Sequence, residues 1–147
     1  MGGVPAWAEQ VITFSDYMGR WLGHPDATPE RVDNAEKLLD ACSDLEVFAR
    51  QDGVEFPLNP ITGTPISGVQ YGGFRPQSCT VGAKKSAHKE GMAVDRYDPD
   101  GKIGAWCLAN LRRLEWCGIY LELPSETPGW SHWTTRKPAS GNRVFHP

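Results

Sequence analysis

The sequence predicts a single α+β domain in which a small, mainly antiparallel sheet has helices packed on one face. Its 147 residues are enough for one domain with one hydrophobic core. Helical and strand-like segments follow one another in a mixed order, without the regular alternation of a parallel α/β sheet. We expect residues 1–68 to form a helical N-terminal part and residues 69–147 to form the core that carries the functional site.

The clearest helix signal covers residues 24–53. Thr28 can cap this helix, Pro29 suits its first turn, and Gly53 is typical of a helix end. Its apolar residues recur at the spacing of one helix face: Val32, Ala35, Leu38, Leu39, Cys42, Leu45 and Phe48. We therefore predict one long amphipathic helix here.

Two further helical segments are predicted. Residues 103–118 form one amphipathic pattern that ends at Gly118. Its inward residues are expected to be mostly Ile103, Trp106, Cys107, Leu111, Leu114 and Cys117. A shorter helical piece is expected within residues 6–22.

Four short segments alternate apolar and polar residues as strands do. They are residues 69–75, 91–97, 119–123 and 129–135. Residues 54–68 are rich in proline and glycine, and residues 76–90 are polar, so both are expected to be loops. Short strands between helices and long loops favour a small sheet.

The composition excludes several classes of protein. Fifteen Lys and Arg against 18 Asp and Glu give a net charge of −3, and no basic block suggests binding to nucleic acid. No apolar run approaches the ~18 residues of a membrane span, so we expect no membrane insertion. Glu9 and Asp16 interrupt the first twenty residues, which lack the pattern of a Sec signal peptide. We expect the protein to be made in the cytoplasm.

The cysteines do not indicate a cysteine-based metal site. Cys42, Cys107 and Cys117 lie among apolar residues, where buried free thiols are expected. Cys79 lies in a polar loop, and no pair has C-x-x-C spacing. A nucleophilic Cys79 acting with His88 stays open as a cysteine-hydrolase alternative.

A candidate metal site is suggested by residues 86–95, SAHKEGMAVD. In a strand over 91–97, Asp95 shares its face with only Gly91 and Ala93, which leaves a hollow beside the carboxylate. His88 precedes the turn at Gly91 and can fold back beside Asp95. His132 can join them if its strand pairs with this one, although an isolated His near an Asp is more often an ordinary polar pair.

Two imidazoles and one carboxylate form a reasonable shell for catalytic zinc, with the fourth position left for water. A general base is then required, and Glu126 and Glu122 lie upstream of His132. Arg75 is placed to stabilise an oxyanion on the scissile carbonyl. These residue types point to hydrolysis of an amide.

Three segments carry a family resemblance: YGGFRP (71–76), SAHKEGMAVD (86–95) and GWSH (129–132). In order and spacing they resemble the zinc D-Ala-D-Ala carboxypeptidase and L-alanyl-D-glutamate endopeptidase family, whose fold is shared with the hedgehog signalling domain. The middle segment matches the family pattern position by position, at Ser86, His88, Gly91, Ala93 and Asp95. The resemblance covers residues 69–147, and the ending is similar to that of small phage-encoded members.

The resemblance implies that Zn²⁺ is the cofactor and that His88, Asp95 and His132 bind it. It implies that Arg75 polarises the scissile carbonyl, that Ser86 holds the substrate or its loop, and that Trp130 lies at the substrate site. The implied partner is the stem peptide of bacterial peptidoglycan. Many active members place the catalytic Glu three residues before the last His, where this chain has Gly129.

The leading hypothesis is therefore a zinc metallopeptidase, a hydrolase acting on peptidoglycan stem peptides. It would be a phage endolysin that reaches the cell wall after phage-mediated release. The sequence leaves open whether a terminal D-Ala or an internal L-Ala–D-Glu bond is cut. The alternative is a non-catalytic zinc-containing binding or structural module of the same fold, which Gly129 favours.

Overall fold

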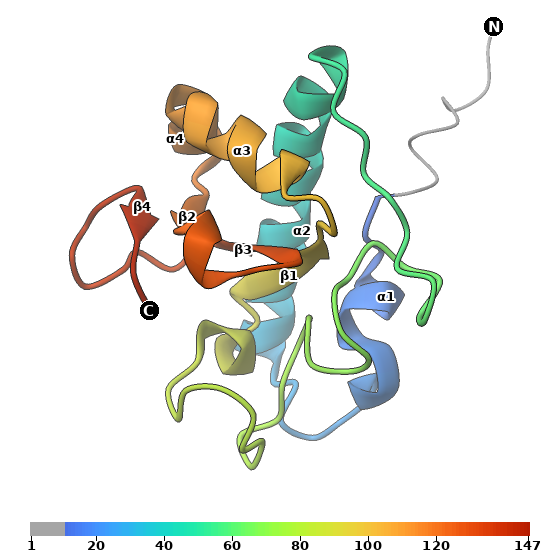
Figure 1. Ribbon diagram of the computed structural model, residues 1–147. Helices are drawn as coiled ribbons and strands as arrows, with labels where there is room; N and C mark the ends of the chain where they lie inside the picture. Colours follow the sequence, from blue (N-terminus) through green and yellow to red (C-terminus); the bar gives the residue numbers. More distant parts are fainter. Residues whose placement is uncertain (1–10) are drawn as a thin grey trace, which may run out of the picture.

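The structure is a computed structural model that describes residues 11–147, and it confirms the α+β class (Figure 1). The helices are α1 (Phe14–Met18), α2 (Pro29–Gln51), α3 (Lys102–Ala109) and α4 (Leu111–Cys117), with short 3₁₀ turns η2 (Gly19–Trp21), η3 (Ala87–Glu90) and η4 (Pro124–Glu126). The strands are β1 (Ala93–Tyr97), β2 (Tyr120–Glu122), β3 (Trp130–Thr134) and β4 (Val144–Phe145).

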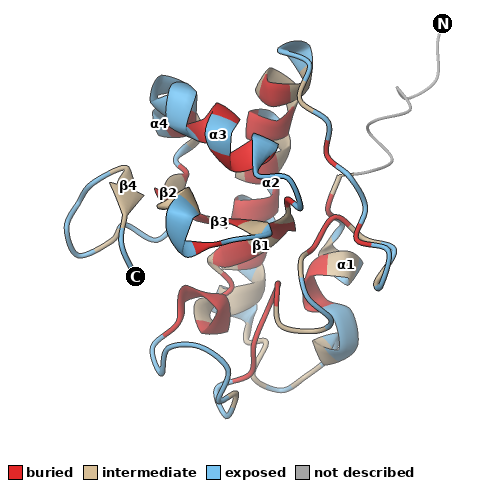
Figure 2. Ribbon diagram, in the orientation of Figure 1, coloured by how far each residue is buried: buried red, intermediate tan, exposed pale blue. Residues whose placement is uncertain are grey.

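The long helix α2 forms where the capping signals predict it. The Thr28 side chain accepts a hydrogen bond from the backbone N–H of Arg31 at 3.3 Å, and Pro29 occupies the first turn. The chain leaves the helix at Asp52 and Gly53. Figure 2 shows buried residues along the side of α2 that faces the sheet. This side of the helix forms part of the hydrophobic core.

The prediction of one helix over residues 103–118 was wrong, because the helix breaks at Asn110. Its backbone leaves the helical region (φ −133°, ψ 44°), and its side chain donates a hydrogen bond to the carbonyl of Trp106 at 2.8 Å. Such side-chain bonds compete with the helical ladder. The break also leaves Leu111 38% exposed, although it was expected to face inward. Gly118 ends α4 as predicted, with φ +75°.

The sheet has the order β1-β3-β2-β4. Strand β3 is antiparallel to both β1 and β2, whereas β4 is parallel to β2, so the sheet is mixed. The predicted strands at 91–97, 119–123 and 129–135 are confirmed in shorter form. Strand β4 was not predicted.

The prediction of a strand over residues 69–75 was also wrong. This segment hydrogen-bonds to three different neighbours: Gly72 O accepts from Asp95 N at 2.7 Å, Phe74 N donates to Tyr17 O at 3.1 Å, and Arg75 N donates to His88 O at 3.2 Å. A regular ladder needs one partner strand, so none forms. A Cβ on Gly73 would overlap the carbonyl oxygen of Tyr17, and glycine allows this close approach.

One hydrophobic core draws on both predicted parts of the chain. It lies between α2, α3, α4 and the sheet face that presents Val94, Leu121 and Trp133, all of them fully buried. The helices therefore pack on this face, as predicted. The expected helical piece at 6–22 appears as α1 and η2, and its residues 6–10 lie outside the described part. Within residues 11–147, no helix has both the length and the apolar character that crossing a membrane requires.

Candidate metal centre

The pairing of β1 with β3 places two predicted metal ligands side by side. Asp95 lies directly opposite His132, and the next pair, Val94 with Trp133, points to the opposite face. Because Val94 and Trp133 are fully buried in the core, Asp95 and His132 must project from the other face. The period of the two strands thus determines which side chains meet.

The third predicted ligand reaches the same place from outside the sheet. His88 lies on η3, whose first residue follows Ser86, and the Ser86 hydroxyl accepts the backbone N–H of His88 at 3.2 Å. Gly91 then turns the chain into β1 with φ +72°, and a Cβ there would lie 2.5 Å from the Arg31 carbonyl. This cap and turn hold His88 above the strand that carries Asp95.

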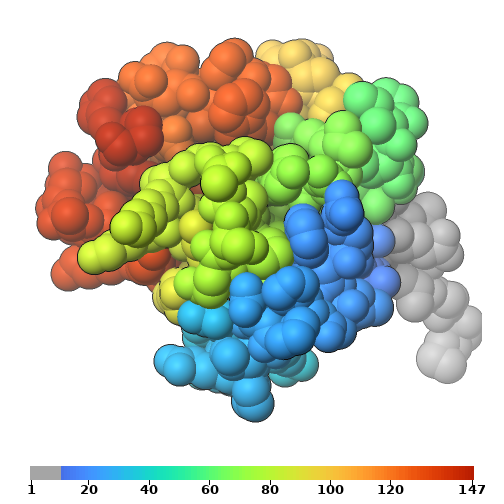
Figure 3. Space-filling view, turned by 90° about the horizontal axis from the view of Figure 1, so that it is seen from below, coloured from blue at the N-terminus to red at the C-terminus, as the bar shows by residue number. Residues whose placement is uncertain are grey.

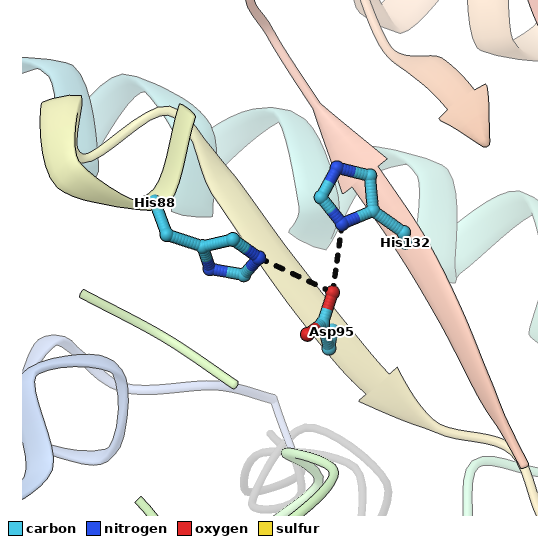
Figure 4. A group of neighbouring side chains, drawn as sticks. All are labelled: His88, Asp95 and His132. Atoms are coloured by element: carbon cyan, nitrogen blue, oxygen red, sulfur yellow. Dashed lines mark hydrogen bonds and ion pairs between the residues drawn. The ribbon is translucent and has the colours of Figure 1, made fainter. Parts of the chain in front are cut away.

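His88, Asp95 and His132 form a close cluster (Figure 4). Asp95 Oδ1 accepts from His132 Nδ1 at 2.7 Å and lies 3.4 Å from His88 Nε2. One potential ligand atom from each residue lies within 4.8 Å of the others. The three groups converge on one point, as a shared cation would require.

The second nitrogen of His88 already has a partner. Its Nδ1 lies 2.8 Å from the Gly73 carbonyl, which can only accept, so Nδ1 carries the proton and Nε2 is left with its lone pair towards Asp95. Burial also lowers the pKa of His88, which favours the neutral ring. Both effects prepare His88 to act as a ligand.

Asp95 is held as a carboxylate despite its surroundings. Burial on its own raises the pKa of Asp95, but the electrostatic and hydrogen-bonding interactions with His88 and His132 outweigh burial. The pKa therefore lies well below the ordinary range of an aspartate. An ionised oxygen beside two imidazoles is a suitable donor set for a divalent cation.

The cluster lies in a pocket of about 490 Å³. Its lining includes the three cluster residues and four more residues predicted from the sequence to be catalytic or substrate-binding: Arg75, Ser86, Glu122 and Trp130. The pocket is large enough for several residues of a peptide in addition to a metal ion. The cluster is therefore accessible to a substrate.

Arg75 is a fixed part of the pocket wall. Its Nε donates to the Tyr71 carbonyl at 2.7 Å, its Nη1 donates to the Val81 carbonyl at 3.2 Å, and its Nη2 lies 3.6 Å from Asp95 Oδ2. Three anchors hold the guanidinium rigidly beside the cluster. Its role towards a substrate carbonyl stays a prediction.

The two candidate bases lie in different environments. The register of β2 with β3, continued by one residue, sets Glu122 opposite His132. Burial raises the pKa of Glu122, an effect that His132 opposes and Asp95 reinforces. Glu126 instead lies on the surface, with Oε1 3.8 Å from Nδ1 of the exposed His146. Glu126 is not among the residues that line the pocket, so the geometry favours Glu122.

Sequence reasoning missed a wall of the pocket contributed by the C-terminal segment. Phe145 of β4 packs edge-on against the His132 ring, with the centroids 6.1 Å apart. A two-residue strand gives too short a pattern to find from sequence. The Cys79 alternative gains no support, because His88 Nδ1 donates to the Gly73 carbonyl, His88 Nε2 points towards Asp95, and the Cys79 thiol faces the Val81 carbonyl.

Comparison with known proteins gives no relative: no family model, curated protein or solved structure matches the chain.

Proposed function

We propose that His88, Asp95 and His132 bind a zinc ion. Tetrahedral ligands about 2 Å from zinc are separated from one another by about 3.3 Å, close to the 3.4 Å between His88 Nε2 and Asp95 Oδ1. The shorter His132–Asp95 contact is a hydrogen bond that must open slightly when the metal replaces its proton. The second partner of His88, the Gly73 carbonyl, is the kind of outer contact that orients metal-bound histidines.

We propose further that the protein is a zinc-dependent peptidase acting on the stem peptides of peptidoglycan. Bound zinc supplies an acidified water and a Lewis acid. Glu122 takes a proton from the attacking water and returns it to the leaving nitrogen, and the Arg75 guanidinium stabilises negative charge on the carbonyl oxygen. Trp130 forms a wall for the peptide. A role as a phage lytic enzyme is part of this proposal and rests on the sequence resemblance.

The observation that carries the proposal is the convergence of three ligand side chains from separate segments inside a pocket that also contains an arginine and a half-buried glutamate. An ordinary hydrogen-bonded pair of His and Asp would require neither a pocket around it nor a half-buried glutamate beside it. The family resemblance in residues 69–147 supplies the substrate class.

The test is hydrolysis of purified peptidoglycan and of synthetic stem peptides, followed by mass spectrometry and by the release of new amino groups. We expect products with zinc, none after chelation, and recovery when zinc is restored. His132→Ala should be inactive, and His24→Ala, a change at a histidine that does not line the pocket, should be active. Identical products with and without chelator would contradict the proposal.

A second candidate function is a zinc-containing binding or structural module without turnover. Gly129 favours it, since related peptidases often have glutamate at that position. Zinc binding with no amide cleavage of any stem peptide would support this module. Cleavage that is lost in Glu122→Gln would exclude it.

A further inference from the structure

Positive charge is concentrated on two segments that flank the pocket, the loop 76–87 and the C-terminal segment 135–147, which includes β4. Residues 76–87 and 135–147 together contain no Asp or Glu, although the whole chain has more acidic than basic residues. Their basic residues are Lys84, Lys85, Arg136, Lys137 and Arg143. Of these residues, Arg136 lines the pocket, so the positive charge favours an anionic ligand at this rim, away from Asp95 and Glu122.

The loop and the C-terminal segment are joined beside the pocket by Arg136. Its Nη1 donates to the Lys85 carbonyl at 3.0 Å, and Figure 3 shows the yellow-green segment that contains the loop next to the orange and red C-terminal part. The backbone N–H of Arg136 donates to the Thr134 hydroxyl, which in turn donates to the Met92 carbonyl at 2.6 Å. The backbone of Arg136 is therefore tied to β3 and to the residue that precedes β1.

Arg136 has more uncommitted donors than Arg75. Arg75 uses Nε, Nη1 and Nη2 on Tyr71, Val81 and Asp95. Arg136 lines the pocket and is exposed, and within residues 11–147 its side chain makes one hydrogen bond, to the Lys85 carbonyl. A guanidinium has five N–H groups in a planar fork that fits a carboxylate.

The distance from the metal centre suits a group at some remove from the reacting bond. Arg136 follows His132 by four residues; because β3 ends at Thr134 and the chain bends at residues 135–136, the two lie at most about 13 Å apart along the backbone. A substrate peptide lying along β3 covers this distance in at most four residues. A substrate group bound by Arg136 would thus belong to the same peptide as the scissile amide, but it would lie away from that amide.

We propose that Arg136 is a specificity-determining residue that binds a carboxylate of the substrate peptide, up to four residues from the bond that is cut. The inference rests on the proposed function in one respect, that the pocket takes a peptide. A stem peptide with lysine at its third position has two carboxylates with the required chemistry, the α-carboxylate of D-isoglutamate and the C-terminal carboxylate.

The experiment compares four synthetic stem peptides: the free acid, the peptide with isoglutamine in place of isoglutamate, the C-terminal amide, and the peptide with both changes. Binding is measured by calorimetry on chelator-treated protein, and hydrolysis is measured on zinc-loaded protein. We expect the wild type to prefer the free acid over one of the single amides by about fivefold, the upper range for an exposed ion pair. The amide that weakens binding identifies the carboxylate.

Arg136→Gln should abolish this preference, and Arg136→Lys should retain part of it. Lys137→Gln is the matched control, because Lys137 is the next residue, is also exposed, and does not line the pocket. It should keep the full preference. Failure of all four peptides to bind, equal binding of all four to the wild type, or a preference that survives in Arg136→Gln would overturn the inference.

The two proposals fail in different ways. Discriminating binding without cleavage would end the peptidase proposal and support the role of Arg136. Zinc-dependent cleavage at equal rates for acid and amide peptides would support the peptidase and overturn the role of Arg136.

Discussion

Replacing Glu122 by Gln is the sharpest test of how the candidate site works. The change keeps the size of the side chain but removes the group that accepts a proton. Glu122 lies across the strand pair from His132 and is half-buried in the pocket. General bases contribute about 10²- to 10⁴-fold, so we expect kcat to fall at least about 100-fold, or about 2.7 kcal/mol of transition-state stabilisation.

Glu126→Gln is the matched control for this prediction. The side chains of Glu126 and of its partner His146 are 47% and 74% exposed, and Glu126 Oε1 lies 3.8 Å from His146 Nδ1. Such a surface pair is screened by water, so kcat should change by less than about twofold. The assay is stem-peptide hydrolysis at saturating zinc, with bound zinc measured in each variant to show that the metal site is intact.

The opposite result would refute the assignment. If Glu126→Gln lost activity and Glu122→Gln kept it, the chain after η4 would have to bend inward during the reaction. The strand register would then not determine which glutamate is the general base.

Three further predictions concern the metal and the core. Zinc at 100 times its Kd should stabilise the fold by about 2.7 kcal/mol and raise Tm by about 5–10 °C, and His132→Ala should remove this shift in calorimetry. Burial lowers the pKa of His88, so the unfolded chain binds a proton at this residue more readily than the folded chain does. The free energy of unfolding of the metal-free protein, measured in urea, should therefore decrease as the pH falls below about 6.5. The decrease should be smaller in His88→Gln, and the exposed His146 gives the control variant His146→Gln. Glu46→Ala leaves the Arg96 charge buried and should cost about 3–5 kcal/mol by urea unfolding.

Local signals predicted the elements whose cause is local. Helix α2 follows from Thr28, Pro29 and its apolar spacing, all within one segment. The meeting of Asp95 with His132 follows from the period of two strands, once these are assumed to pair. In each case the determining residues lie next to one another in the sequence or in one strand pair.

Tertiary contacts decided the features that sequence reasoning got wrong. Residues 69–75 have strand-like composition, but their hydrogen bonds go to Tyr17, His88 and Asp95, and no local pattern reveals this division. Strand β4 is only two residues long and exists because β2 has a free edge for it.

The choice between the two glutamates has the same origin. Glu126 is nearer to His132 in sequence, six residues away against ten for Glu122. In the fold, η4 carries Glu126 to the surface, while β2 returns Glu122 to the pocket beside β3. Sequence distance is a poor guide wherever a turn separates two paired strands.

The orientation of Asp95 depends on neighbours that have no chemical role. Both residues beside it in β1 point into the core: Val94 is fully buried, and Arg96 is 1% exposed. The Arg96 guanidinium lies over the Phe56 and Trp133 rings, at 4.8 and 5.3 Å, and pairs with Glu46 of α2 at 2.9 Å. A rotation of β1 that moved Asp95 away from the histidines would have to break this buried pair. The position of the candidate ligand is therefore maintained by the opposite face of the sheet, which explains how a cluster beside an open pocket can be preorganised for a metal ion.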